Sequence, residues 1–408
     1  SFIAVASIIV DYVLTASIST VSAVENGMTF FNIGATGKFI FEIGIVWFVA
    51  GLNILGIKEN AKFTFGIFVI AAIVLINLLT QGILHTTPHG WQTAGASFVS
   101  VFQNFEGKNI FSMYFLVIVS VSSCILAYSG IESVVQTAGL VKSWKDVKKA
   151  YIFLALTTGI FTPVLALIVL SSNIKFGEHE TDLITQFAKM VGGVPFGYIV
   201  GITASILLMM AVNTAYVASS ELVERVAHRY GFHWVMKTNK RQSLYRVHIG
   251  SAIFYSCIIL LTGGSQRILA EMYALGLLAS FTINMGSLLI YRYSKGTKDV
   301  RAFNTHRSLT LILFAIFLSC FLYLGYHKPY GTVMWGSVTA VFLFIGLRVA
   351  KKRAPEIKEI KQTDAPLNMI FQLAESNDEH VDVYFRRPHE IASEKAVDSS
   401  EVYISLYH

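Results

Sequence analysis

The chain has 408 residues, of which 54% are hydrophobic and 14% are charged, and its mean hydropathy is +0.58. This composition excludes an ordinary soluble domain, in which about 25% of residues are charged. It is typical of a protein that crosses a membrane several times. The formal net charge of +7 could indicate nucleic-acid binding, but the distribution of the basic residues has another explanation, given below.

Ten apolar runs are long enough to cross a bilayer as helices, which takes about 20 residues. We expect helices because backbone groups in lipid must hydrogen-bond within their own segment, and because the runs lack the alternation of a β-barrel. The predicted fold class is an all-α integral membrane protein, with a transporter-like domain at 1–350 and a cytoplasmic tail at 351–408. The expected spans are 2–24, 39–57, 62–84, 110–138, 150–171, 192–217, 247–263, 269–291, 309–325 and 330–350.

The first span contains Asp11 near its centre. A carboxylate there is unfavourable by roughly 2.5–3.5 kcal/mol on insertion scales, so such residues are usually functional. Thr15, Ser19 and Ser22 follow at i+4, i+8 and i+11, which places all four on one helical face; we call these four residues the polar stripe. Tyr12 lies beside it. The pattern predicts a solute or cation site, and the alternative is a structural carboxylate held by neighbouring hydroxyls.

The fourth run is longer than one crossing requires, and it contains the polar segment Tyr128-Ser129-Gly130-Ile131-Glu132. Interrupted spans mark binding sites in transporters built from inverted repeats. We therefore expect the helix to break at Ser129 and Gly130, with both residues facing the substrate. Glu132 either couples protons or holds the break through hydrogen bonds. The alternative is an uninterrupted helix with a polar patch.

Three connecting segments carry further expectations. The outer segment 86–103, with Pro88 and Trp91, is predicted to be an interfacial loop with an aromatic anchor. The segment 217–246 is expected to hold a separate, short amphipathic helix on the cytoplasmic face. Glu42 and Glu271 lie near the outer ends of their spans and are expected to be solvated at the interface.

Basic residues gather in alternate connections, at 142–149, 225–246, 292–307 and 348–353, and are sparse in the others. The positive-inside rule places the basic connections and the C-terminus in the cytoplasm. The basic excess therefore reflects topology, and no nucleic-acid partner is expected. The tail has two strand-like runs, 381–385 and 402–406, and could begin a cytosolic domain. Since Ser1 lies directly against the first span, we expect a segment to precede it.

Taken together, these segments resemble the amino acid–polyamine–organocation (APC) superfamily of transporters. The motif at 128–133 and the basic loop after it are similar to that superfamily's broken sixth helix, Asn213-Thr214-Ala215-Tyr216 to its eighth, and Met272-Tyr273-Ala274-Leu275-Gly276 to its tenth. The resemblance implies a LeuT-like bundle of two inverted repeats. The ten spans then become helices three to twelve, and the first two helices are absent.

Within this superfamily, the run Asp11-Tyr12-Val13-Leu14-Thr15 is most similar to the KimA/YdaO-like branch of proton-coupled potassium importers. The resemblance implies cation-site roles for the residues at the matching positions. The chain departs from that branch at Ser129, where threonine is usual, although serine keeps the hydroxyl group. The residues with an implied cation-site role are Asp11, Tyr12, Thr15, Ser19, Ser129 and Tyr273.

We expect a secondary active transporter of the cell (plasma or inner) membrane that imports an amino acid or similar small solute by alternating access. Potassium import is the first alternative and a membrane solute sensor the second. The partners are the solute or monovalent cation and the lipid bilayer, with a homodimer left open. An enzyme is not expected, and neither is a cofactor beyond a coupling ion, H⁺. His85 and His89 lack a third ligand, so no metal site is predicted.

Overall fold

The structure is a computed structural model. It describes residues 2–353 except 32, 57–60, 129–143, 173, 175–176, 178 and 296–305, and it also describes the tail segments 360–363, 382–386 and 403–407. Everything below concerns these residues.

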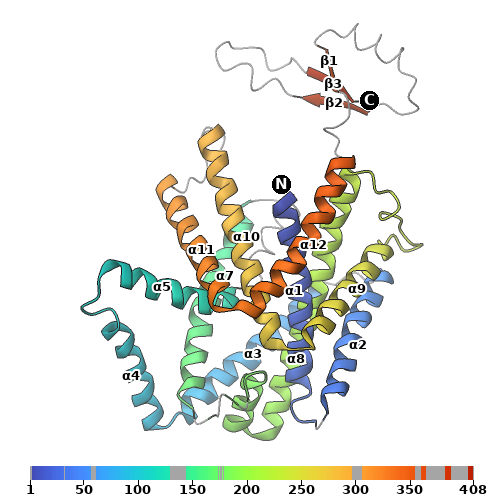
Figure 1. The fold of residues 1–408 in the computed structure, drawn as a ribbon. Helices are drawn as coiled ribbons and strands as arrows, with labels where there is room; N and C mark the ends of the chain where they lie inside the picture. Colours follow the sequence, from blue (N-terminus) through green and yellow to red (C-terminus); the bar gives the residue numbers. More distant parts are fainter. Residues whose placement is uncertain are drawn as a thin grey trace.

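Ten of the described helices are long and apolar enough to cross a membrane, which confirms the predicted all-α membrane fold (Figure 1). Each coincides with one predicted span, and most ends agree to within four residues; α8 extends well beyond its predicted span at both ends, and α7 begins six residues early. The helices are α1 (Phe2–Gly27), α2 (Ala35–Ile54), α3 (Ala61–His85), α5 (Ile110–Cys124) continued by the 3₁₀ turn η1 (Ile125–Tyr128), α7 (Trp144–Leu170), α8 (Leu183–Arg229), α9 (Tyr245–Thr262), α10 (Gln266–Lys295), α11 (Arg307–His327) and α12 (Pro329–Arg353).

The outer segment that was predicted to be a loop is instead a helix, α4 (Pro88–Gln103). The Thr87 hydroxyl accepts a hydrogen bond from the Gly90 N–H at 3.2 Å, and Pro88 occupies the first helical turn. Both features are typical of helix starts, because a side-chain oxygen satisfies an otherwise unpaired N–H and proline lacks one. Helix α4 lies at the periphery of the bundle (Figure 1) and contacts α7.

The prediction of a separate amphipathic helix after the sixth span is also wrong. Helix α8 instead continues from that span to Arg229. Glu221, Glu224 and Arg225 therefore lie on an extension of a membrane span. The only non-helical residue inside α8 is Gly193, with φ 79° and ψ 175°, followed by Pro195. A positive φ is readily adopted by glycine, so the kink falls where the sequence permits it.

The helix contacts have the pattern of an inverted repeat. Exchanging α1 with α8, α2 with α9 and α3 with α10 leaves the set of contacting pairs among these six helices unchanged. Thus α1–α9 becomes α8–α2, α1–α2 becomes α8–α9, α3–α8 becomes α10–α1, and α1–α8 and α2–α9 map onto themselves. Helices α1 and α8 run in opposite directions (Figure 1). This is the relation expected of two repeats around a two-fold axis in the membrane plane.

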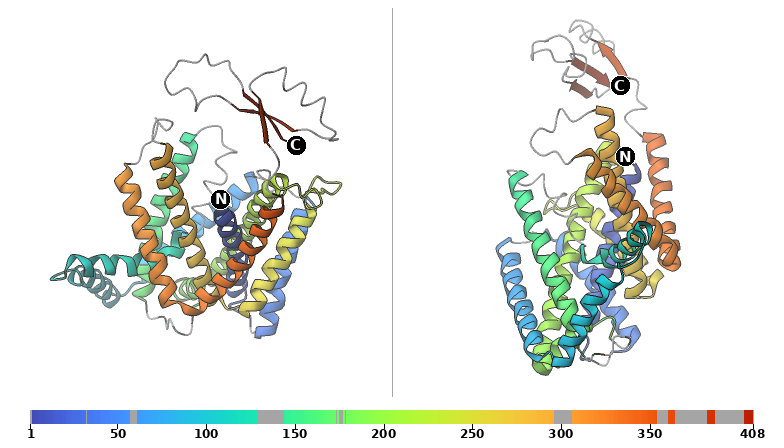
Figure 2. Two further views of the ribbon diagram at one scale, coloured as in Figure 1. Left: turned by 45° about the horizontal axis from the view of Figure 1, so that its top comes forward. Right: turned by 90° about the vertical axis from the view of Figure 1, so that its left-hand side faces the viewer.

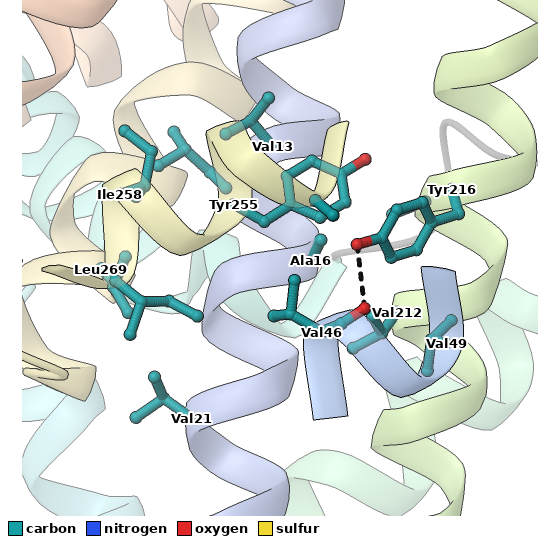
Figure 3. Close-up of a cluster of buried hydrophobic side chains, with 14 of the residues drawn as sticks. Val13, Ala16, Val21, Val46, Val49, Val212, Tyr216, Tyr255, Ile258 and Leu269 are labelled. Atoms are coloured by element: carbon teal, nitrogen blue, oxygen red, sulfur yellow. Dashed lines mark hydrogen bonds between the residues drawn. The ribbon is translucent and has the colours of Figure 1, made fainter. Parts of the chain in front are cut away.

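Helix α1 is the centre of the bundle. Its most apolar window is 78% buried, more than that of any other candidate span, and it contacts α2, α8, α9, α10 and α12. One side packs into the cluster drawn in Figure 3, with Val13, Ala16 and Val21 against side chains of α2, α8, α9 and α10. In this cluster the Tyr216 hydroxyl donates to the Val46 carbonyl at 3.0 Å, which ties α8 to α2.

The contact between α1 and α8 depends on small residues. A Cβ atom at Gly201 would lie 2.8 Å from the Asn26 carbonyl oxygen, and one at Gly27 would lie 2.6 Å from Ser205 Oγ. The Ser205 hydroxyl also donates to the Ala23 carbonyl at 2.6 Å. Small residues let helix backbones approach closely in membranes, where packing and interhelical hydrogen bonds drive association.

The tail contains an antiparallel sheet with strand order β1-β3-β2, drawn in Figure 2. Strands β2 (Asp382–Arg386) and β3 (Tyr403–Tyr407) correspond to the two predicted runs, each displaced by one residue. Strand β1 (Ile360–Thr363) was not predicted. Both β1 and β2 pair with β3, with Thr363 and Phe385 opposite Ile404.

Gly201→Ala should destabilise the protein by about 1–3 kcal/mol, the usual range for overpacking a tight contact, because the new methyl group meets a backbone oxygen that cannot turn away. The melting temperature of the purified protein in detergent tests this. Gly66→Ala on α3 is the matched control, since a Cβ there meets nothing within 4 Å. Equal melting temperatures for both variants would contradict the close α1–α8 contact.

Candidate functional site

The structure buries the polar stripe of α1 inside the bundle. Asp11 is 2% exposed, Ser19 7% and Ser22 9%, and the adjacent Tyr12 is 6% exposed. Thr15 is half-buried. These residues therefore do not face lipid, as expected for polar groups in a span.

Thr15 is the only half-buried member of the polar stripe, whereas Asp11, Ser19 and Ser22 are buried. Val13 and Ala16, on the apolar sides of α1, are also almost fully enclosed. Any access to the polar stripe among the described residues is therefore at Thr15.

Hydroxyl groups on α1 donate to the backbone one turn earlier. Thr15 Oγ1 donates to the Asp11 carbonyl at 2.8 Å, and Ser17 and Thr20 do the same to Val13 and Ala16. Ser17 and Thr20 are fully buried, which gives them a structural role. Thr15 differs because it is partly accessible. With its proton engaged, its oxygen presents lone pairs, which suit a positively charged solute.

Tyr273 lies on α10 and is 1% exposed. It belongs to the same buried cluster as Val10, Leu14 and Ala16 of α1. The two helices approach closely here, since a Cβ at Gly276 would lie 3.6 Å from Leu14 Cδ1. The structure therefore brings the helices of Tyr273 and Asp11 together, and Tyr273 also packs as a core aromatic.

The described residues of this segment end at Tyr128, directly before the predicted helix break. The α-helical conformation of α5 ends at Cys124 and tightens into η1, one residue before Ser129. Ser129, Gly130 and Glu132 themselves lie outside the described residues. The turn η1 contacts α10, and its Leu126 packs against the cluster that contains α1. Three elements that carry or lead into predicted site residues, α1, α10 and η1, therefore meet.

The burial of Glu42 was not predicted, because its position near the end of a span indicated a carboxylate solvated at the membrane interface. It is 3% exposed, and its Oε2 atom has no hydrogen-bond partner among the described residues. The carboxylate lies against the α9–α10 turn, 2.9 Å from where a Cβ of Gly264 would stand. The paired glycines at 263 and 264, both with positive φ, were the available signal.

Glu271 is also not simply solvated. Its Oε1 atom lies 3.1 Å from Lys328 Nζ and 3.7 Å from Arg267 Nε, so the N-terminal part of α10 is joined to the α11–α12 turn. At the C-terminal end of α1, Glu25 pairs with Lys38 at 2.7 Å. These contacts fix helix ends and stand apart from the polar stripe.

Comparison with known families decides the broader identity. The family model described as "Amino acid permease" matches residues 1–348, which is nearly the whole helical bundle. The chain belongs to the amino acid permease family. A search of curated proteins found no match. Together with the ten apolar helices and the inverted contact pattern, the family match makes this permease a multi-pass membrane transporter of the APC type.

Gly264→Ala should lower the stability of this permease more than Gly263→Ala does. Both residues have positive φ, 69° and 61°, so each alanine carries a backbone penalty of roughly 1–2 kcal/mol. Only Gly264 meets the Glu42 carboxylate, whereas a Cβ at Gly263 meets nothing within 4 Å. The difference between the two melting temperatures isolates the carboxylate contact. Indistinguishable values would show that Glu42 can move away freely.

Proposed function

We propose that this permease imports an amino acid or a similar small solute by alternating access, driven by protons, across the cell membrane, with its C-terminus in the cytoplasm. The observation that carries the proposal is the burial of Asp11 on the central helix, at 2% exposure, with α10 and η1 packed nearby. A carboxylate at such a site attracts positive charge strongly, because the surroundings have a low dielectric constant.

In this proposal the polar stripe forms one wall of the site. Asp11 compensates the positive charge of the solute or takes up the coupling proton, and Tyr12, Thr15 and Ser19 supply oxygens along the same face. Tyr273 contributes from α10. Ser129 and Gly130 face the solute at the break after η1, and Glu132 is the candidate for proton coupling.

Alternating access requires one group of helices to hold its shape while others move against it. Helices α1, α2, α8 and α9 are good candidates for the fixed group. Besides the Tyr216 bond, Asn53 Nδ2 donates to Asn213 Oδ1 at 2.7 Å, and the Ser219 and Tyr255 hydroxyls lie 3.1 Å apart. The first two contacts join α2 to α8, one helix from each repeat, and the third joins α8 to α9 within the second repeat.

Potassium is the second candidate cargo. The specific observation in its favour is the Thr15 hydroxyl, whose proton is engaged by the Asp11 carbonyl, so that an oxygen lone pair stands one turn from a buried carboxylate. Carboxylate and hydroxyl oxygens are hard ligands suited to a hard monovalent cation. An amino acid would use the same carboxylate for its ammonium group.

Asp11→Asn should reduce uptake of the true cargo at least tenfold, because loss of a buried charge contact is worth about 2 kcal/mol or more and 1.4 kcal/mol is a factor of ten. Uptake is measured with the full-length protein in proteoliposomes. Ser17→Ala is the control on the same helix, since that buried hydroxyl bonds only to Val13, and it should transport normally. Unchanged uptake in Asp11→Asn would show that the transport site does not lie on α1.

The cargo itself is decided by two assays on the same full-length protein. Radiolabelled amino acid uptake, dependent on an inward proton gradient, supports the first proposal. Rescue of growth at limiting potassium, with no amino acid uptake, supports the second. If the protein shows neither amino acid uptake nor rescue of growth, and Asp11→Asn has no effect on transport, both proposals are wrong.

A further inference from the structure

A second cavity, distinct from the polar stripe, lies at the end of the bundle that the basic connections assign to the cytoplasm. Its volume is about 820 Å³, and it is formed by the end of α2, the last turns of α8, the segment joining α8 to α9 and the start of α9. None of its lining residues lies on α1, η1 or α10. Pockets of roughly 300–1,000 Å³ are the usual size for small-molecule sites.

The wall made by the α8–α9 connection is held firmly. Its Asn239, Arg241 and Ser243 side chains donate to the carbonyls of Ile54, Leu55 and Asn53 respectively. These carbonyls lie at the C-terminal end of α2, where backbone acceptors lack intrahelical donors. The connection therefore caps α2, and the cavity is a fixed feature of this part of the fold.

One face of α8 lines the cavity with three polar residues and one valine. Asn213, Val217, Ser220 and Glu224 are spaced i, i+4, i+7 and i+11. His248 also lines the cavity and is 5% exposed, and its Nδ1 atom has no hydrogen-bond partner among the described residues. A buried ring nitrogen without a partner is unfavourable, and a polar ligand in the cavity could satisfy it.

Backbone strain points to the same place. Gln242 lines the cavity and has φ 61°, the only positive φ of a non-glycine residue among the described residues. The left-handed conformation costs roughly 1–2 kcal/mol for such a residue. Strain of this kind tends to occur at ligand sites, where a side chain must be held in one position. A glycine would have removed the strain and also the amide group.

The charges that line the cavity select the class of ligand. They are one carboxylate, on Glu224, and one guanidinium, on Arg241, both at the exposed rim. A simple anion would be repelled by Glu224, and a simple cation by Arg241. A molecule that carries both an ammonium and a carboxylate group can pair with both, and the side-chain amide of Gln242 lines the same cavity.

We propose that this cavity is a cytoplasmic binding site for a small zwitterionic solute of the free amino acid type. The site lies outside the proposed transport path, so it can exist whether the cargo is an amino acid or potassium. Phosphatidylethanolamine headgroups carry the same pair of charges, and the experiment separates the two sources.

Binding is tested by protection of an introduced cysteine. Thr238→Cys is made in the full-length protein with Cys124 and Cys257 replaced by serine, and inside-out vesicles are treated with a membrane-impermeant maleimide. Thr238 lines the cavity and is exposed. Lys237→Cys is the matched control, because this neighbour is exposed but does not line the cavity.

Glutamine should slow modification of Thr238→Cys about tenfold at ten times its half-saturating concentration, since the unprotected fraction falls as 1/(1 + [L]/Kd). Its decarboxylated amine, 4-aminobutanamide, and its deaminated acid, glutaramate, should give no protection at that concentration. The Lys237→Cys rate should not change. Absence of protection by glutamine, or equal protection by the amine or the acid alone, would overturn the proposal.

Three variants assign the effect to the cavity. Glu224→Gln and Arg241→Gln should each abolish protection. Because Arg241 also donates to the Leu55 carbonyl in the cavity wall, an unchanged melting temperature in Arg241→Gln shows that the lost charge, and not a loosened wall, is responsible. Gln242→Gly should weaken protection while keeping or raising the melting temperature, because it relieves the strained φ. Protection that persists in all three variants would place the ligand elsewhere and refute the site.

The lipid source is tested in reconstituted vesicles of phosphatidylcholine with and without phosphatidylethanolamine. The proposal expects glutamine to protect equally in both. Protection by phosphatidylethanolamine with no further effect of glutamine would contradict it. Labelling reports binding without transport. Protection by glutamine should therefore persist in Asp11→Asn even if this variant loses uptake, which distinguishes the cavity from the proposed transport site.

Discussion

The arrangement of the bundle follows from one constraint, which is that the polar stripe of α1 cannot face hydrocarbon. A buried carboxylate and three hydroxyls on one span are tolerated only inside protein or along a water-filled path. Helix α1 is accordingly surrounded by α2, α8, α9, α10 and α12. The outer helices show the reverse, with Phe63 on α3 and Phe153 on α7 more than half exposed, as suits a lipid-facing surface.

Enclosing α1 with helices of both repeats requires the backbones to come close. Gly201 and Gly27 allow this at the α1–α8 contact, and Gly276 allows it against α10. A Cβ atom would be too close to its neighbours at Gly27 and Gly201, and would make an ordinary van der Waals contact at Gly276. The inverted contact pattern has a structural consequence. The second repeat covers those sides of α1 that the first repeat leaves open.

Much of this architecture was predictable, and the failures have physical causes. Span number and the stripe follow from apolar length and helical period, which are local properties. Pro88 was misjudged because proline both ends loops and begins helices, and only the Thr87 cap decides between them. The burial of Glu42 depends on a turn more than 200 residues away in sequence. The residues after Tyr128 were singled out by composition alone, and their roles remain predictions.

Helix α8 connects the two candidate sites. Near its middle, Gly201 and Ser205 contact the C-terminal part of α1, and further along, Asn213, Val217, Ser220 and Glu224 line the second cavity. At 1.5 Å per residue, about 18 Å of helix separates Gly201 from Asn213, and the only described departure from helical geometry in α8 is at Gly193, outside this interval. Because the cavity and the α1 contact lie on one continuous helix, the solute that we propose for the cavity would act on the central helix through α8, without sharing any residue with the polar stripe.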